Sequence, residues 1–217
     1  MTPTYWPEAK AALRKRDKVL KTIIDSYRGE AMRLRGDPFF TLARSITGQQ
    51  VSVKAADSVW NKLLAALPLP DSLPQAGEGI MITPGQIAAM DAKTLRACGL
   101  SERKVMYLHG LANHFLENKQ QVKNWPTLPD DGIIRELVAL HGIGRWTAEM
   151  FLIFGLGRPD VFPLDDLGLL KGIHRHYNKG KPLPLRKIIA IGENWRPYRS
   201  LGTWYMWRVL DPLPVAY

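Results

Sequence analysis

The 217-residue sequence predicts an all-α protein. Apolar side chains recur at helical spacing along most of the chain, and Pro, Gly and cap residues divide these stretches into roughly ten helices. No segment combines two-residue alternation with the turn residues of a β-hairpin. Hydrophobic residues make up 46% of the chain, which excludes a mainly disordered protein and suffices for one sizeable core or two small lobes.

The individual helices follow from the pattern in chain order. Residues 7–27 form one amphipathic stretch, with Leu13 and Leu20 on its apolar face and the basic run 14–16, typical of a solvated face, on another. Residues 68–82, rich in Pro and Gly, are predicted to form a loop. Cap residues and prolines predict further helices over 39–47 behind Asp37, over 53–64 behind Ser52, from Pro84 within a capping box, from Asp91 to Gly99, and from Ser101 to about Leu116.

Charge and cysteine content narrow the class of protein. Lys and Arg outnumber Asp and Glu by 30 to 20, and the pI is about 9.8, which suggests an anionic partner such as nucleic acid. No apolar run approaches the roughly 18 residues that cross a bilayer, and no secretory signal is recognisable, so we expect a soluble, intracellular protein. The single cysteine, Cys98, excludes an internal disulfide and an iron-sulfur cluster held by four cysteines of this chain. The pair His174 and His176 lacks the further ligands of a metal site.

Residues 140–148, LHGIGRWTA, have the features of an anion-binding corner. Glycines at positions 142 and 144 admit backbone conformations that are closed to residues with a Cβ, and they can turn amide groups outward. The helix predicted to start at Arg145 adds the positive end of its dipole. A preceding helix is predicted from Pro129, so that the unit reads helix, tight hairpin, helix. Taken alone, a Gly-x-Gly pattern is also typical of an ordinary turn.

A pair of acidic residues follows at positions 165 and 166, after Pro163. We expect Asp165 to cap the helix that begins there, and Asp166 to lie in its first turn, where the helix dipole stabilises a negative charge. From position alone, an exposed first-turn acid without a catalytic role is the simpler interpretation of Asp166.

Together these segments resemble a known family. Residues 140–151, followed by 160–167 (DVFPLDDL), are similar to the helix-hairpin-helix and the Gly/Pro-rich loop ending in aspartate of the base-excision DNA glycosylase superfamily. Within it, the chain resembles the 3-methyladenine DNA glycosylase II branch. Further signatures of that branch are matched at 45–56 (SITGQQVSVKAA), 98–104 (CGLSERK) and 195–207 (WRPYRSLGTWYMW).

The resemblance implies two helical lobes with a DNA-binding cleft. The first lobe would span residues 37–157 and contain the helix-hairpin-helix at about 129–154. The second would combine residues 1–36 with 158–217 and carry the catalytic loop. Larger bacterial members have an extra N-terminal β-containing domain, for which this chain has no room, so a compact form is expected.

The resemblance also implies the chemistry. Cleavage of a base from deoxyribose develops positive charge on the sugar, as in other glycoside hydrolyses. By similarity, Asp166 is the carboxylate that stabilises this charge and orients the attacking water. Family members that also cut the strand place a Schiff-base lysine just after the Gly-x-Gly-Arg sequence. This chain has Trp146 there, so we expect a monofunctional enzyme that leaves an abasic site.

A base in a duplex reaches such a carboxylate only when it is flipped out of the helix. The resemblance places Gln50 where the family inserts a wedge side chain, although a plain loop glutamine is an alternative interpretation. The family's hairpin also holds a monovalent cation, Na⁺ or K⁺, through carbonyls that correspond here to Val138, Leu140 and Ile143, and no other cofactor is expected. The implied DNA contacts are Gln50, Ser52, Gly142, Ile143, Gly144, Arg145 and Thr147.

An aromatic pocket is expected, because bases methylated on ring nitrogens carry positive charge and a cation over an aromatic face is favoured by about 0.5–2 kcal/mol. By similarity, Trp146 and Trp207 line this pocket, with Phe40 and Trp204 as further candidates. Core packing is the alternative for any one of these rings. Met150 lies at a pocket position where larger bacterial members have a tyrosine, and His141 replaces their hairpin proline.

We therefore expect a monofunctional DNA glycosylase that hydrolyses the N-glycosidic bond of alkylated purines, of the 3-methyladenine and 7-methylguanine type, in base excision repair. Two alternatives stay open: the same fold acting on deaminated or mismatched bases, and a non-catalytic helix-hairpin-helix DNA-binding protein. The expected partner is double-stranded DNA with damaged bases, bound by a monomer without membrane association. The expected location is the cytoplasm, at the nucleoid, in a bacterium, or the nucleus in a eukaryote.

Overall fold

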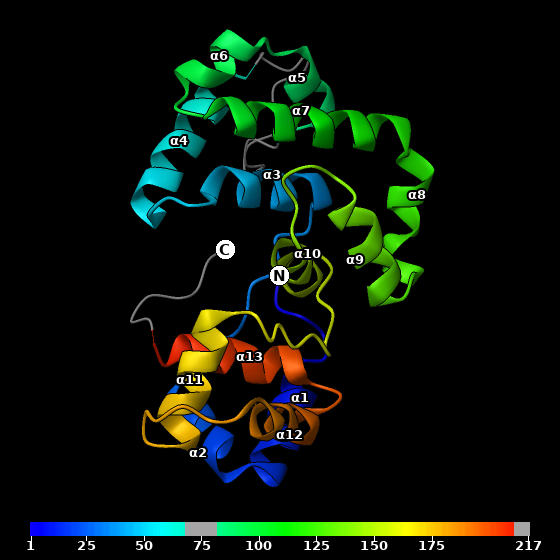
Figure 1. Ribbon diagram of the computed structural model, residues 1–217. Helices are drawn as coiled ribbons and strands as arrows, with labels where there is room; N and C mark the ends of the chain where they lie inside the picture. Colours follow the sequence, from blue (N-terminus) through cyan, green and yellow to red (C-terminus); the bar gives the residue numbers. More distant parts are fainter. Residues whose placement is uncertain (68–81, 211–217) are drawn as a thin grey trace. The chain divides into compact units, whose positions relative to one another are not determined.

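The computed structural model describes residues 1–67 and 82–210. Over these ranges the chain forms helices and no strands, as the sequence predicts, and it divides into two compact units (Figure 1). Unit 1 combines Met1–Gly36 with Leu152–Tyr217, and unit 2 is the continuous stretch Asp37–Phe151. The units therefore divide at Asp37, where the first predicted lobe begins, and after Phe151 rather than Gly157. No helix in the described part of the chain has the length and apolar character to span a membrane.

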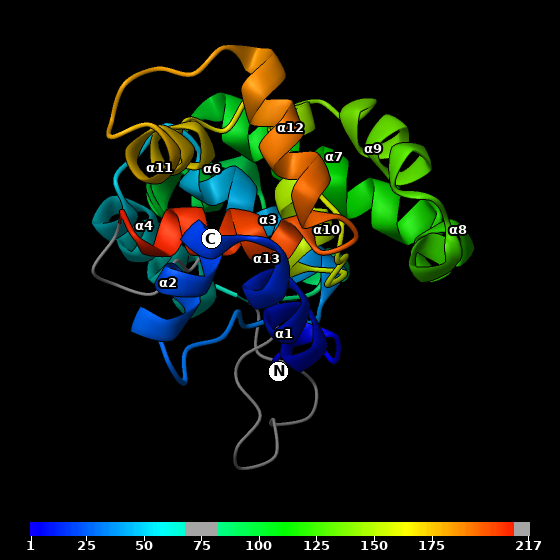
Figure 2. The same cartoon turned by 90° about the horizontal axis from the view of Figure 1, so that it is seen from below.

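Unit 1 is built around one helix that is buried on every side. Its helices are α1 (Trp6–Arg16), α2 (Lys18–Ser26), α11 (Leu167–Tyr177), α12 (Leu185–Trp195) and α13 (Arg199–Arg208). Every residue of α13 from Ser200 to Arg208 is buried. This helix contacts the other four, and Figure 2 shows it between the pair α1 and α2 on one side and the pair α11 and α12 on the other.

Unit 2 packs around its longest helix, α7. In chain order it contains α3 (Pro38–Gly48), α4 (Val53–Ala65), α5 (Pro84–Ala89), α6 (Ala92–Ala97), α7 (Glu102–Glu117), α8 (Lys119–Asn124), the 3-10 turn η1 (Trp125–Thr127), α9 (Asp130–Val138) and most of α10 (Arg145–Phe154), whose last turn belongs to unit 1. Helix α7 contacts α3, α5 and α6. An aromatic cluster fills the core beside it, where Trp125 packs edge-on against Phe115 and Phe151 at centroid distances of 5.4 and 5.3 Å.

The predicted caps are present in unit 2. The side chains of Asp37, Ser52, Asp91 and Ser101 each accept a backbone amide at the start of α3, α4, α6 and α7 respectively. The capping box of Thr83 and Gln86 forms in both directions. The predicted loop 68–82 lies outside the described residues except for Ile82, which is buried.

The predicted helix over residues 7–27 is wrong, because the structure has two helices there. The helix is interrupted at Asp17, whose backbone is extended and whose side chain caps α2. The other carboxylate oxygen of Asp17 accepts hydrogen bonds from the Tyr177 hydroxyl at 2.6 Å and from the Trp195 indole at 3.0 Å. The amphipathic pattern continues across the break. The hydrogen-bond donors that stabilise the break, Tyr177 and Trp195, lie in α11 and α12, more than half the chain away.

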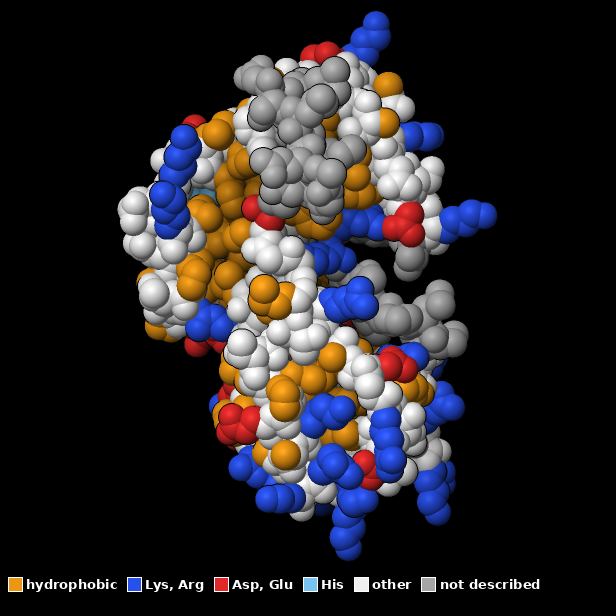
Figure 3. All heavy atoms as spheres, turned by 180° about the vertical axis from the view of Figure 1, so that it is seen from behind, with side chains coloured by type: hydrophobic (Ala, Val, Ile, Leu, Met, Phe, Trp, Pro, Cys, Tyr) orange, Lys and Arg blue, Asp and Glu red, His pale blue; other side chains and the backbone are white. Residues whose placement is uncertain are grey.

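The net charge is divided unequally between the two units. Lys and Arg outnumber Asp and Glu by 19 to 9 in unit 1 and match them at 11 to 11 in unit 2, so that unit 1 carries the whole net charge of +10. On the face drawn in Figure 3, Lys and Arg side chains are spread over the surface of unit 1. Between Asp166 and Glu193 the sequence has six Lys or Arg and no carboxylate.

Replacement of Asp17 by Ala should destabilise unit 1, because it removes the cap of α2 and leaves the Tyr177 hydroxyl and the Trp195 indole buried without their acceptor. We expect the free energy of unfolding, measured by urea denaturation, to fall by about 3 kcal/mol. Burial, together with the hydrogen bond to Asp17, raises the pKa of Tyr177, so the hydroxyl remains a donor at neutral pH.

The matched control is Asp25→Ala, which removes a carboxylate from the surface of α2, where it pairs with Arg14 and Lys21. Solvent screens this pair, so the urea curve should be nearly unchanged. Equal losses in the two variants would contradict the role of the buried network around Asp17.

Candidate functional site

A tight hairpin joins α9 to α10 in unit 2. The Ile143 amide closes its turn by donating to the Leu140 carbonyl at 3.1 Å. Gly142 has a φ of +88°, and a Cβ at this position would lie 2.3 Å from the ring of Tyr107 in α7. Position 142 therefore requires glycine both for its left-handed backbone and for the close approach of the hairpin to α7.

Gly144 does not have the conformational role that the sequence suggested. Its φ lies outside the left-handed region, and a Cβ there would meet no atom within 4 Å. Neither backbone conformation nor packing within this chain requires a glycine at this position. The space beside Gly144, at the start of α10, is open to a ligand.

Two of the predicted DNA contacts have their side chains in the interior. Ile143 and Thr147 are each 4% exposed, and the Ile143 amide is used within the turn. Their side chains therefore offer almost no surface to a ligand. Arg145, by contrast, lies exposed on the first turn of α10, where its Nε donates to Glu149 Oε1 at 3.1 Å.

The Gly-Gln-Gln turn, residues 48–50, is joined to the hairpin by a residue that the sequence did not single out. Gln49 donates from Nε2 to the Gly142 carbonyl at 2.8 Å. The neighbouring Gln50 is exposed, with a left-handed φ of 58°, and its side chain makes no hydrogen bond to any described residue. Ser52 is also exposed and caps α4 by accepting the Ala55 amide at 3.3 Å.

The hairpin, the Gly-Gln-Gln turn and the start of α7 enclose a hollow of about 550 Å³. Arg103 and Lys104 border it from α7, opposite hairpin residues 138–144. Lys104 Nζ donates to the Thr47 carbonyl at 2.8 Å, and burial lowers the pKa of this ammonium group. Basic side chains and the N-terminus of a helix around one hollow suit an anion.

In unit 1, the helix cap is the second member of the acidic pair and not, as predicted, the first. Asp166, and not Asp165, is the N-cap of α11, and its Oδ1 accepts the Leu169 amide at 2.5 Å. The same oxygen accepts the indole N–H of Trp207 at 2.7 Å. Asp166 is consequently only 6% exposed, whereas Asp165 lies at the surface. The interpretation of Asp166 as an exposed first-turn acid is therefore wrong.

Close packing fixes Trp207 beside the carboxylate. The ring of Phe154 stacks on Trp207 with centroids 5.7 Å apart. A Cβ at Gly168 would lie 2.9 Å from the Trp207 ring and 3.1 Å from Asp166 Oδ1, so the glycine leaves room for their approach. A carboxylate held by two donors at a helix N-terminus is a preorganised negative charge, able to stabilise a developing cation without rearranging.

The two pocket candidates of unit 1 differ in what they contact. Trp207 is buried and donates to Asp166. Trp204, one turn earlier in α13, packs edge-on against Trp6 at 5.2 Å and against Tyr205 at 4.9 Å. Core packing therefore accounts for the Trp204 ring.

The other three pocket candidates lie in unit 2. Met150 is buried, while Phe40 and Trp146 are half-buried. Phe40 packs edge-on against Trp60 with centroids 5.2 Å apart. Of the three, Phe40 and Trp146 keep part of their rings accessible.

The described residues contain no group of three His, Cys, Asp or Glu side chains that could hold a metal ion. His174 and His176 lie in the last turn of α11.

Comparisons with known proteins identify the family to which this fold belongs. Residues 43–197 match the HhH-GPD family, described as an HhH-GPD superfamily base excision DNA repair protein. DNA-3-methyladenine glycosylase 1 of Schizosaccharomyces pombe is 31% identical over 196 residues, which cover 88% of this chain and 80% of that protein.

Solved structures show the same similarity. A DNA-3-methyladenine glycosidase from Bacillus halodurans aligns with a TM-score of 0.79 and 29% identity over 95% of this chain and 90% of that one. The 3-methyladenine DNA glycosylase of Schizosaccharomyces pombe in complex with abasic DNA aligns with a TM-score of 0.75 and 28% identity over 97% of this chain and 100% of that one. The family match includes both the hairpin and Asp166, and the chain belongs to the HhH-GPD superfamily of base excision DNA repair proteins.

Proposed function

We propose that this protein is a monofunctional DNA glycosylase that hydrolyses the N-glycosidic bond of alkylated purines, such as 3-methyladenine and 7-methylguanine, in base excision repair. The observation that carries the proposal is the Asp166 carboxylate, buried at the N-terminus of α11 and held by two donors. The names of the similar glycosylases support alkylated purines as the substrate class. The protein would act as a monomer on double-stranded DNA, at the nucleoid of a bacterium or in the nucleus of a eukaryote.

Asp166 would act on the sugar of the damaged nucleotide. When the bond between C1′ and the base nitrogen breaks, the electron pair leaves with the base and the sugar becomes an oxocarbenium-like cation. A fixed negative charge favours this state over the ground state, because the positive charge develops on the sugar only as the bond breaks. Water then adds to C1′ and loses a proton, which leaves an abasic site. A base methylated on a ring nitrogen is already cationic and therefore departs as a good leaving group.

The hollow at the hairpin would receive a DNA phosphate. Gly144 borders open space, α10 contributes the positive end of its dipole, and Arg145 is exposed beside them. Gln50, exposed on the turn that Gln49 ties to the hairpin, would enter the space left by the flipped base. The net positive charge of unit 1 would add to the attraction of a polyanion.

A monovalent cation, Na⁺ or K⁺, would bind at the same hairpin. Val138, Leu140 and Ile143, whose carbonyls would be its ligands, all border the hollow. The Leu140 carbonyl accepts the Ile143 amide and has a second lone pair for an ion. Such an ion would add positive charge where the phosphate is proposed to bind.

Asp166→Asn should abolish base release while it preserves the fold. The amide oxygen of Asn can still accept from Leu169 and Trp207, so the variant removes the charge and keeps both hydrogen bonds. We expect single-turnover release of 3-methyladenine from methylated duplex DNA to fall at least about 100-fold.

Asp165→Asn is the matched control and should keep the wild-type rate, because Asp165 lies at the surface. Full activity of Asp166→Asn would contradict the catalytic assignment. Failure of the wild type to release any methylated base would contradict the substrate class, and release of hypoxanthine or a mismatched base would then identify the alternative.

Base release should leave the DNA strand intact. Trp146 stands where the resemblance places the lysine of strand-cutting members, and an indole forms no Schiff base with the sugar. In the same reactions, the DNA should migrate at full length until alkali is added, and borohydride should trap no covalent complex. A trapped complex of the wild-type protein would overturn the monofunctional assignment.

Two glycine substitutions should separate folding of the hairpin from DNA binding. Gly142→Ala puts a Cβ against Tyr107 in a left-handed backbone, and should lower both the free energy of unfolding, by about 2 kcal/mol, and the affinity for DNA. Gly144→Ala puts its methyl group into open space, and should cost at most about 1 kcal/mol at the residue before α10.

The affinity for undamaged duplex, measured over a range of KCl concentrations, is the informative quantity. Wild-type affinity should fall steeply as salt rises. Gly144→Ala should bind more weakly than the wild type at every salt concentration, because its methyl group obstructs the phosphate. Wild-type affinity in Gly144→Ala would exclude the hairpin as the phosphate site.

A further inference from the structure

Asp166, the proposed catalytic carboxylate, is the last residue of a segment that contains no helix. Residues 155–166 connect α10 to α11. The backbone hydrogen bonds that the segment makes within itself include one from the Asp166 amide to the Pro163 carbonyl at 3.0 Å. A loop of this kind takes its position from partners elsewhere in the protein.

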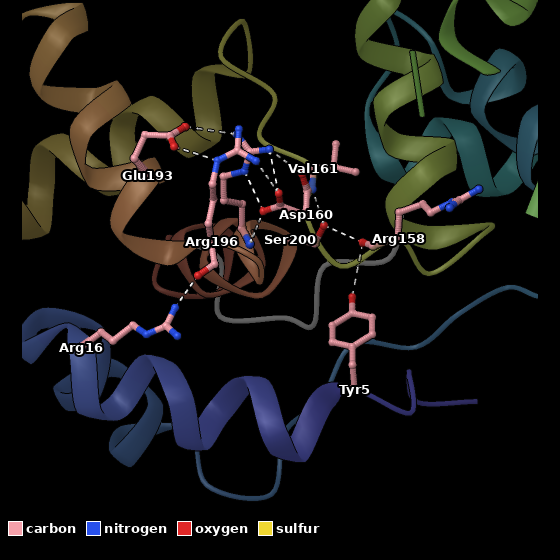
Figure 4. A network of polar contacts seen from close by, with 9 residues as sticks. Tyr5, Arg16, Arg158, Asp160, Val161, Glu193, Arg196 and Ser200 are labelled. Carbon is pink, nitrogen blue, oxygen red and sulfur yellow. Dashed lines mark hydrogen bonds and ion pairs between the residues drawn. The ribbon is translucent and has the colours of Figure 1, made fainter. Parts of the chain in front are cut away.

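The first of these partners is Arg199, at the start of α13. Its Nε donates to Asp160 Oδ1 at 2.7 Å and its Nη2 to Asp160 Oδ2 at 3.0 Å, and Nη2 also donates to the Asp160 carbonyl at 2.9 Å. Arg196 adds a donor to the same carboxylate at 2.8 Å, and Glu193 pairs with both arginines. Figure 4 shows Arg196 between Glu193 and Asp160. A planar guanidinium that binds both carboxylate oxygens fixes direction as well as distance.

The second partner is Ser200, which is fully buried. Its amide donates to the Pro159 carbonyl at 2.9 Å, and its hydroxyl donates to the Arg158 carbonyl at 2.6 Å. The same hydroxyl oxygen accepts the Val161 amide at 3.0 Å. The side chain and the backbone amide of Ser200 therefore bind three backbone groups of the loop. Figure 4 shows the two contacts of the hydroxyl.

The other end of the loop is held by the same helix. Trp207 of α13 donates to Asp166 Oδ1 at 2.7 Å. Arg199 and Trp207 are eight residues apart, which corresponds to about 12 Å along a helix. Since α13 is buried along nearly all its length, this spacing is rigid.

We propose that Arg199 and Ser200 are positioning residues for catalysis. They fix residues 158–161 against the start of α13, and in this way they set the position in which Asp166 meets Trp207 near the C-terminal end of the same helix. The inference rests on the proposed function, because it assigns the catalytic charge to Asp166. Neither residue touches Asp166, so each acts only through the loop. Their loss should therefore change the rate of base release and leave DNA affinity unaltered.

The test compares Ser200→Ala and Arg199→Lys with the wild type. Arg199→Lys keeps the positive charge and loses the two-oxygen contact, so it also serves if Ser200→Ala folds poorly. We expect single-turnover release of 3-methyladenine to fall about 10-fold in each, since small misplacements of a catalytic group are costly, with unchanged affinity for undamaged duplex. Glu193→Gln is the control: Glu193 pairs with Arg196 and Arg199 at the surface, touches no loop residue, and should keep the wild-type rate.

The same substitutions in an Asp166→Asn background separate positioning from general stability. If Arg199 and Ser200 act through the charge of Asp166, the small residual rate of Asp166→Asn should not fall further. An equal 10-fold fall in both backgrounds would overturn the proposal, and so would wild-type rates in both single variants.

A second readout does not depend on activity. The indole N–H resonance of Trp207, assigned with Trp207→Phe in ¹⁵N-labelled protein, reports the hydrogen bond to Asp166. It should shift in Ser200→Ala and Arg199→Lys and stay in place in Glu193→Gln. An unmoved resonance would overturn the positioning role even if the wild type released no methylated base, an outcome that would count separately against the proposed function.

Discussion

The architecture of unit 1 depends on the burial of α13 from Ser200 to Arg208. Four helices cover this one, so it cannot shift without disturbing all of them. The loop that ends at Asp166 is bonded to α13 near both ends, through Ser200 and through Trp207. The position of a carboxylate on an irregular segment is thereby fixed by the most constrained helix in the unit. Functional groups gain accuracy when rigid elements support them, and here the support comes from the helix core.

The helices of unit 2 were largely predictable, because their signals act within one turn. Asp37, Ser52 and Ser101 cap the helices that follow them, as expected. The same rules failed at Asp17, where the amphipathic pattern continues through a break that Tyr177 and Trp195 stabilise from distant helices. Local rules give helix starts reliably when the cap is solvent-exposed. They fail when the capping side chain is also part of the core.

The candidate site was predictable to a similar degree. The glycine pattern and the acidic pair pointed to the hairpin and to the carboxylate, but the contacts that distinguish Asp166 from Asp165, with the Leu169 amide and the Trp207 indole, come from the structure. Trp204 and Trp207 are the same residue type one helical turn apart, and only their contacts in the structure distinguish them. Trp204 packs against Trp6, whereas Trp207 donates a hydrogen bond to the Asp166 carboxylate. Gln49 and Ser200 were missed, because they bind backbone groups, and such contacts leave no pattern in the residues they bind.

The division of the chain into units also bears on its biosynthesis. Unit 2 is one continuous segment inserted between the two segments of unit 1, so it can complete its core once residue 151 has left the ribosome. The helices α1 and α2 are made earlier, yet both pack against α13, which is made only after unit 2. Within unit 1, α1 and α2 are thus synthesised before α11 to α13 but complete their packing only with them. The time that the ribosome needs to make the inserted unit sets how long the apolar surface of α1 and α2 needs protection from aggregation.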